Sequence, residues 1–97
     1  MKAIFLAYNQ ALTEAINSIL DHYKIRGYTK WADVQGRGSV TGEPHFGTHT
    51  WPAMNSAILA IAEDELVEPF LENLKKLNAK AEQQGLRAFV WNIEEMI

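Results

Sequence analysis

Two kinds of apolar pattern alternate along the 97 residues, and their order is the feature that most limits how this chain can fold. Four short runs rich in apolar, aromatic and β-branched side chains are too short for buried helices, and each predicts a strand. They cover residues 2–8, 28–34, 55–62 and 86–93. Two longer segments repeat apolar residues every three or four positions, as one face of a helix does. These residues are Leu12, Ala15, Ile16, Ile19, Leu20 and Tyr23 in the first segment, and Val67, Phe70, Leu71, Leu74, Leu77 and Ala81 in the second.

Local signals predict where the two helices begin and end. Gly27 follows the first segment and is expected to stop its helix, since glycine readily takes the left-handed conformation of a helix C-terminus. Three consecutive acidic residues, 63–65, suit the start of the second helix, where they meet the positive end of its dipole. Pro69 is then expected in the first turn, which tolerates a missing N–H, and the helix is expected to stop near Gly85.

The order strand, helix, strand, strand, helix, strand predicts an α+β fold, the ferredoxin-like βαββαβ sandwich. In this fold a four-stranded antiparallel sheet carries two helices on one face. A chain of this length is expected to form a single domain over residues 1–97, with a thin stability margin if it stays alone.

The other face of the predicted sheet is also apolar. A face in contact with water would give strands that alternate apolar and polar residues. In residues 55–62 and 86–93, apolar side chains instead occupy most positions of both alternating sets. We therefore expect a homo-oligomer packed through the open face; the alternative is apolar surface tolerated in water.

A long connection joins the second and third predicted strands. Residues 36–54 contain four glycines, two prolines, two histidines and one tryptophan, far more chain than a hairpin needs. Long connections of this kind inside compact domains are usually functional or disordered. The aromatic and histidine content favours a functional loop over a spacer with no task.

Two short motifs resemble a known family. Residues 34–38, Val-Gln-Gly-Arg-Gly, followed by a long loop, are similar to the segment at which proteins of the PII-like (nitrogen regulatory protein PII) superfamily leave their second strand. Residues 89–97, Phe-Val-Trp-Asn-Ile-Glu-Glu-Met-Ile, are similar to the family's last strand and the residues that follow it. The resemblance implies a homotrimeric signalling protein without enzymatic activity. It also implies ligand clefts between subunits that bind adenine nucleotides, and a loop that docks on a target such as a transporter or an enzyme.

The resemblance also implies specific ligand-binding residues. Gly36, Arg37 and Gly38 stand at the base of the family's loop, where the missing glycine side chains allow backbone N–H groups to approach phosphate oxygens. Arg87 stands where the family has a phosphate-binding lysine just before the last strand, and its guanidinium is suited to an anion. The alternative for Arg87 is an ordinary exposed charge.

Three loop residues carry metal-binding groups. Glu43, His45 and His49 offer a carboxylate and two imidazoles, which are ligands of zinc, nickel and copper. The alternative function is therefore a metal-responsive trimer similar to the divalent-cation tolerance proteins of the CutA type. Solvated or hydrogen-bonded histidines are the simpler interpretation.

Two aromatic side chains of the loop predict a contact surface for a partner. Phe46 and Trp51 are expected to contact a protein partner.

A third function, a small cofactor-independent enzyme of the dimeric α/β-barrel type, is less favoured. Suitable groups are supplied by His49, Asn55, Trp31 and Trp91, but nothing places a base beside a substrate. No catalytic residue is therefore predicted.

Composition excludes several other classes. The chain has no cysteine for disulfides or thiolate sites, which fits a reducing compartment, and we expect a cytoplasmic location. Its net charge of −3 and scattered basic residues argue against nucleic-acid binding. The apolar run at residues 3–8 is too short for a signal-peptide core or a membrane span, so no membrane insertion is expected.

Overall fold

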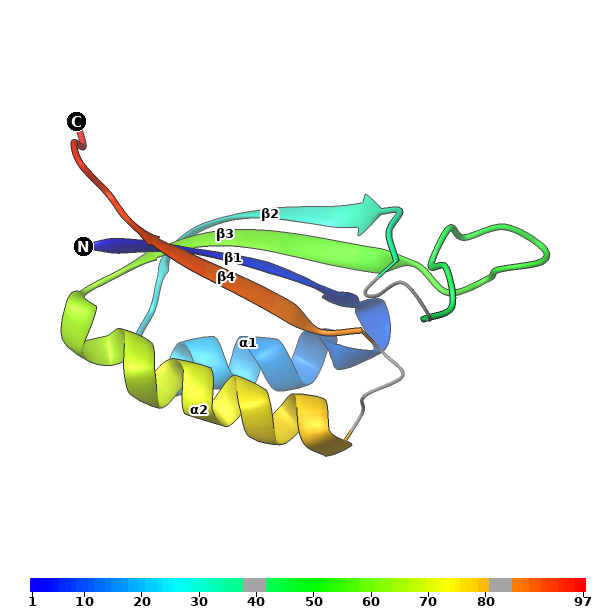
Figure 1. The fold of residues 1–97 in the computed structure, drawn as a ribbon, viewed down its shortest axis with the longest axis horizontal. Helices are drawn as coiled ribbons and strands as arrows, with labels where there is room; N and C mark the ends of the chain where they lie inside the picture. The colour runs from blue at the N-terminus through cyan, green and yellow to red at the C-terminus, as the bar shows by residue number, and fades with distance from the viewer. Residues whose placement is uncertain (38–41, 81–84) are drawn as a thin grey trace.

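The structure of the protein is a computed structural model, and it describes residues 1–37, 42–80 and 85–97 (Figure 1). The element order is the predicted one, with one added turn of 3-10 helix. The elements are β1 (Lys2–Asn9), η1 (Gln10–Leu12), α1 (Thr13–His22), β2 (Gly27–Val34), β3 (Asn55–Ala62), α2 (Asp64–Lys80) and β4 (Arg87–Asn92).

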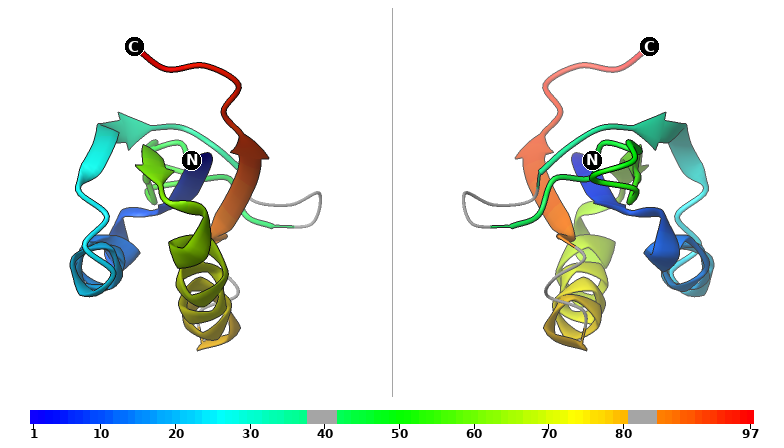
Figure 2. Two further views of the ribbon diagram at one scale, coloured as in Figure 1. Left: turned by 90° about the vertical axis from the view of Figure 1, so that its left-hand side faces the viewer. Right: turned by 90° about the vertical axis from the view of Figure 1, so that its right-hand side faces the viewer.

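The four strands form one antiparallel sheet in the order β2-β3-β1-β4, so β1 and β3 lie at its centre. Phe5 on β1 lies opposite Leu59 on β3 and opposite Phe89 on β4, which puts these three side chains on the same face. Helices α1 and α2 lie side by side on the other face (Figures 1 and 2). The predicted α+β sandwich is therefore confirmed.

The core lies between the sheet and the two helices. Ile4, Leu6 and Tyr8 point from β1 into this layer and are fully buried, where they join Ile16 of α1 and Phe70 of α2. Burial raises the pKa of the Tyr8 hydroxyl above its ordinary value of 10.0, and the nearby hydroxyls of Thr13 and Ser56 offset part of this shift. Within the described ranges, neither helix combines the length and apolar character that a membrane crossing requires.

The first helix does not stop at Gly27, as the sequence suggested, but at His22. Lys24 takes the left-handed conformation with φ 56°, and the N–H of Ile25 donates to the carbonyl of Leu20 at 2.9 Å. This is the bond pattern of a Schellman C-cap, and its apolar residue is Ile25, which is buried in the core. The buried isoleucine fixes the helix end, and Gly27 becomes the first residue of β2.

The second helix also differs from expectation near its start. It begins at Asp64, so Pro69 is its sixth residue and lies beyond the first turn. Pro69 has no N–H to donate to the Glu65 carbonyl, and both residues are exposed, so water can replace the missing hydrogen bond. At the other end, Gly85 has φ 69°, a left-handed conformation that favours glycine, but the segment between Lys80 and Gly85 lies outside the described residues.

Aromatic side chains remain exposed on the face of the sheet that carries no helix. Phe89 is 56% exposed, Trp91 50% and Trp31 45%. Their strand register places them on the same side as Phe5, Leu59 and Ile61. In the single chain this face is therefore apolar and uncovered, as the sequence predicted.

Candidate ligand-binding site

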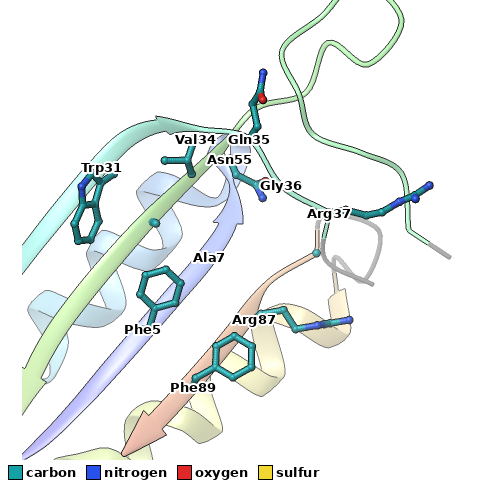
Figure 3. A pocket seen from close by; sticks show the side chains of 12 residues that line it. Phe5, Ala7, Trp31, Val34, Gln35, Gly36, Arg37, Asn55, Arg87 and Phe89 are labelled. Atoms are coloured by element: carbon teal, nitrogen blue, oxygen red, sulfur yellow. The ribbon is translucent and has the colours of Figure 1, made fainter. Parts of the chain in front are cut away.

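A concavity of about 530 Å³ lies on this open face, at the end of the sheet where β2 continues into the long connection (Figure 3). We call it the loop-base cavity. Its apolar walls come from the sheet and are formed by Phe5, Ala7, Trp31, Ala57 and Phe89. Its polar end is formed by Gln35, Gly36, Arg37, Asn55 and Arg87. The strand register thus joins an aromatic surface to the base of the loop.

The polar end is positively charged. Among its described lining residues, Arg37 and Arg87 carry charge and none carries a carboxylate. The Nε of Arg37 donates to the Gly42 carbonyl at 2.7 Å, and the Nη1 of Arg87 donates to the Leu86 carbonyl at 3.1 Å. Each guanidinium keeps further N–H groups that can bind an anion.

The connection folds back on itself directly after β2. Gly36 and His45 pair as in an antiparallel ladder, with N–H to carbonyl distances of 3.0 and 2.7 Å. Phe46 pairs in turn with Met54, and its carbonyl accepts a hydrogen bond from Gln35 Nε2 at 3.0 Å. The base of the loop is therefore a small extension of the sheet, built from three segments of the connection.

Side chains from two other elements fix the point where β2 leaves the sheet. The pairing of β2 with β3 shifts register between Trp31 and Val34. Gln10 Nε2 donates to the Ala32 carbonyl at 2.7 Å, and Ser56 Oγ donates to the same carbonyl at 2.5 Å. These bonds satisfy the carbonyl that the irregular pairing frees, and they hold the strand end beside the cavity.

A buried polar pair lies under the loop base. His45 Nδ1 and Asn55 Oδ1 are 2.7 Å apart, and each residue is only 4% exposed. Asn55 Nδ2 lies against Gly36, where a Cβ atom would be 2.8 Å from it. The pair connects the first residue of β3 with the returning segment of the loop.

The structure brings together three of the four residues predicted to bind ligand. Gly36, Arg37 and Arg87 all line the loop-base cavity, whereas Gly38 lies outside the described residues.

The three residues considered as metal ligands lie in different environments. His45 is buried and hydrogen-bonded to Asn55, while Glu43 and His49 are exposed. In the parts of the chain that the structure describes, no three His, Cys, Asp or Glu side chains are grouped as a metal site would need.

The two residues predicted to contact a partner, Phe46 and Trp51, differ in how far they are exposed. Trp51 is 36% exposed. Phe46 is partly buried, and its backbone belongs to the ladder at the loop base.

The sequence did not indicate the cavity's aromatic walls or its amide. In the sequence Phe5 and Phe89 are ordinary strand residues, and Trp31 and Asn55 indicate a role only in the less favoured enzyme. Polar Asn55 at the start of a strongly apolar strand is the one signal that points to a role at this end of the sheet.

Comparison with known proteins gives a family match over the whole chain. The family model described as nitrogen regulatory protein P-II matches residues 1–97. No curated protein matches the sequence.

Solved structures share the fold. CPII, a nitrogen regulatory PII-like protein from Thiomonas intermedia K12, was solved bound to ADP, AMP and bicarbonate. It is 24% identical with a TM-score of 0.77, and the match covers 95% of this chain and 84% of that chain. The same protein bound to ADP and bicarbonate matches with 26% identity and a TM-score of 0.72, over the same shares of the two chains. A protein described as PII-like from Thermus thermophilus is 18% identical with a TM-score of 0.67, covering 95% of this chain and 85% of that one.

Proposed function

Because this chain belongs to the nitrogen regulatory protein P-II family, we propose that it is a regulatory protein that binds a small anionic ligand in the loop-base cavity. The proposed ligand is an adenine nucleotide or another small anion such as bicarbonate. Binding alters the conformation of residues 36–54 and so changes their contact with a partner protein. The proposed assembly is a homotrimer, and the signal passes without any chemical step on the ligand.

The observation that carries this proposal is the composition of the loop-base cavity. Arg37 and Arg87 supply guanidinium groups, which pair well with phosphate and carboxylate oxygens. Trp31, Phe5 and Phe89 supply flat apolar surface on the side of the sheet, suited to a planar base. The phosphates and the base of a nucleotide thus each have a matching surface in the cavity. The PII-like protein CPII was solved bound to ADP and bicarbonate.

The location of the cavity supports a link between ligand and loop. Gly36 and Arg37 belong at once to the cavity wall and to the loop base, and Arg37 contacts the Gly42 carbonyl farther along the connection. A ligand that draws the Arg37 side chain toward itself competes with this contact. Binding can therefore shift the population of loop conformations.

The open sheet face supports self-association. A small domain gains stability when subunits cover exposed aromatic side chains, and three lie on this face. Because the cavity lies on the same face, subunit packing would narrow it and surround a bound ligand more completely.

The test is calorimetric titration of nucleotide-free protein with ADP, AMP, ATP and sodium bicarbonate, after light scattering has determined the number of subunits. We expect a trimer and saturable binding of at least one nucleotide. Arg87→Ala should weaken ADP binding about tenfold or more, since hydrogen bonds to charged groups are strong. It should change the binding of adenosine, which carries no phosphate, much less.

Lys76→Ala is the matched control, because Lys76 is an exposed cation on α2, on the helical side of the sheet. It should bind ADP as the wild type does. Absence of binding to all four anions, or equal loss in Arg87→Ala and Lys76→Ala, would contradict the proposal.

A further inference from the structure

The hydrogen bond between His45 and Asn55 is buried beside the loop-base cavity and joins the loop to the sheet. Its two residues are 4% exposed and its length is 2.7 Å. His45 comes from the connection and is paired through its backbone with Gly36, while Asn55 begins β3. A buried polar side chain without its partner is costly, so these two groups hold each other in place.

The chemistry of the pair determines which end of the Asn55 amide faces the cavity. With the amide oxygen Oδ1 facing the ring, as in this structure, the tautomer that fits is the one in which His45 Nδ1 carries a proton and donates it. The Nδ2 group then points the other way, against Gly36, in the wall that Gly36 and Asn55 share (Figure 3). In the neutral tautomer with its proton on Nε2, Nδ1 would accept, and the amide would have to turn and present its oxygen instead.

We propose that His45 is a positioning residue that keeps the N–H groups of Asn55 directed at an anion in the loop-base cavity, and that Asn55 is thereby a determinant of anion binding. The inference rests on the proposed function for the presence of an anion there. An N–H donor stabilises an anionic oxygen, whereas a carbonyl oxygen in the same place repels it. Because His45 belongs to the loop, the donor is in place only while the loop base is folded as described.

Two substitutions test the two halves of this proposal, with ADP and sodium bicarbonate as probes and adenosine as the uncharged reference. Asn55→Asp keeps an oxygen to accept from His45 but replaces the donor Nδ2 with an oxygen. We expect it to weaken binding of both anions at least about tenfold and to change adenosine binding much less. His45→Leu, which cannot donate a hydrogen bond to Asn55, should weaken the binding of both anions by a similar factor.

Rescue separates positioning from a merely structural role. In His45→Asn the side-chain nitrogen takes a place near that of Nδ1 and can donate to Asn55, so anion affinity should return to within about threefold of wild type. His49→Leu, at an exposed histidine of the same loop, should bind as wild type does. Circular dichroism and the unfolding midpoint check that each variant is folded.

A spectroscopic measurement on the wild type keeps the proposal testable even if a His45 variant unfolds. Long-range ¹H–¹⁵N spectra distinguish the ring tautomers, and we expect His45 to carry a proton on Nδ1. A neutral ring protonated on Nε2 alone would overturn the proposal, as would undiminished anion binding by folded Asn55→Asp. Wild-type protein that binds no anion at all would instead refute the proposed function, and this inference with it.

Discussion

At Gly36 the loop base leaves no room for a side chain larger than hydrogen. Its backbone exchanges two hydrogen bonds with His45, and the space where a Cβ would lie is taken by Asn55 Nδ2. The amide cannot move aside freely, because Asn55 is buried and bonded to His45. Steric fit, hydrogen bonding and burial therefore depend on one another at this position.

We expect Gly36→Ala to lower the free energy of unfolding by about 1–3 kcal/mol, since the added methyl forces the Asn55 amide away from its buried partner. Gly27→Ala is the matched control: the nearest atom to its Cβ would be the Ile61 carbonyl oxygen at 4.0 Å. That control should change stability by less than about 0.5 kcal/mol. Urea unfolding at one fixed protein concentration measures both, and equal losses would contradict the steric account.

The sequence predicted part of this residue-scale arrangement. Gly36, Arg37 and Arg87 were expected near a ligand from a resemblance of short motifs, and all three line the cavity. The burial of His45 could not be predicted, because it depends on the loop folding back to pair with Gly36. The sequence favours a solvated or hydrogen-bonded histidine over a metal ligand, and the hydrogen bond between His45 and Asn55 agrees with that interpretation.

Among the elements, strands were predicted more accurately than helix ends. The limits of β3 agree with the expected residues 55–62, since a continuous apolar run bounded by polar residues leaves little freedom. The end of α1 was misplaced because a buried side chain determines it: Ile25 packs into the core and forces the turn at Lys24. The aromatic walls of the cavity escaped prediction because only the register brings Trp31, Phe5 and Phe89 to one face.

The left-handed Lys24 gives a test of the corrected helix end. Lys24→Gly should raise the free energy of unfolding by about 0.5–1 kcal/mol, because glycine adopts φ 56° without the steric penalty of a Cβ. Lys24→Ala removes the same charge but keeps the Cβ and should give no such gain. Denaturant unfolding of the three proteins makes the comparison; a glycine variant no more stable than the alanine variant would show that the cap is not strained.

In the whole molecule, one face of the sheet packs on helices and the other carries both the exposed aromatic side chains and the loop-base cavity. This arrangement links the proposed assembly to the proposed ligand site. Subunits that meet through the open face would also enclose the apolar side of the cavity. Oligomerisation and ligand affinity should then weaken together when the face is disrupted.

Trp91→Glu places a charge on this apolar face, and Trp91 is 50% exposed in the single chain. We expect light scattering to show a shift from trimer to monomer, because burying an unpaired carboxylate in an apolar interface is unfavourable. Lys76→Glu puts the same charge on the exposed side of α2 and should leave the trimer intact. A Trp91→Glu protein that remains trimeric would place the interface elsewhere.

The central claim is that an anionic nucleotide binds in the loop-base cavity, and the most direct measurement is an amide ¹H–¹⁵N NMR titration of nucleotide-free protein with ADP. The account predicts saturable shifts concentrated at Gly36, Arg37, Asn55 and Arg87, residues of the cavity wall. The exposed side of α2 should remain unchanged. Saturable shifts confined to the helices, or no shifts at any ADP concentration, would contradict it.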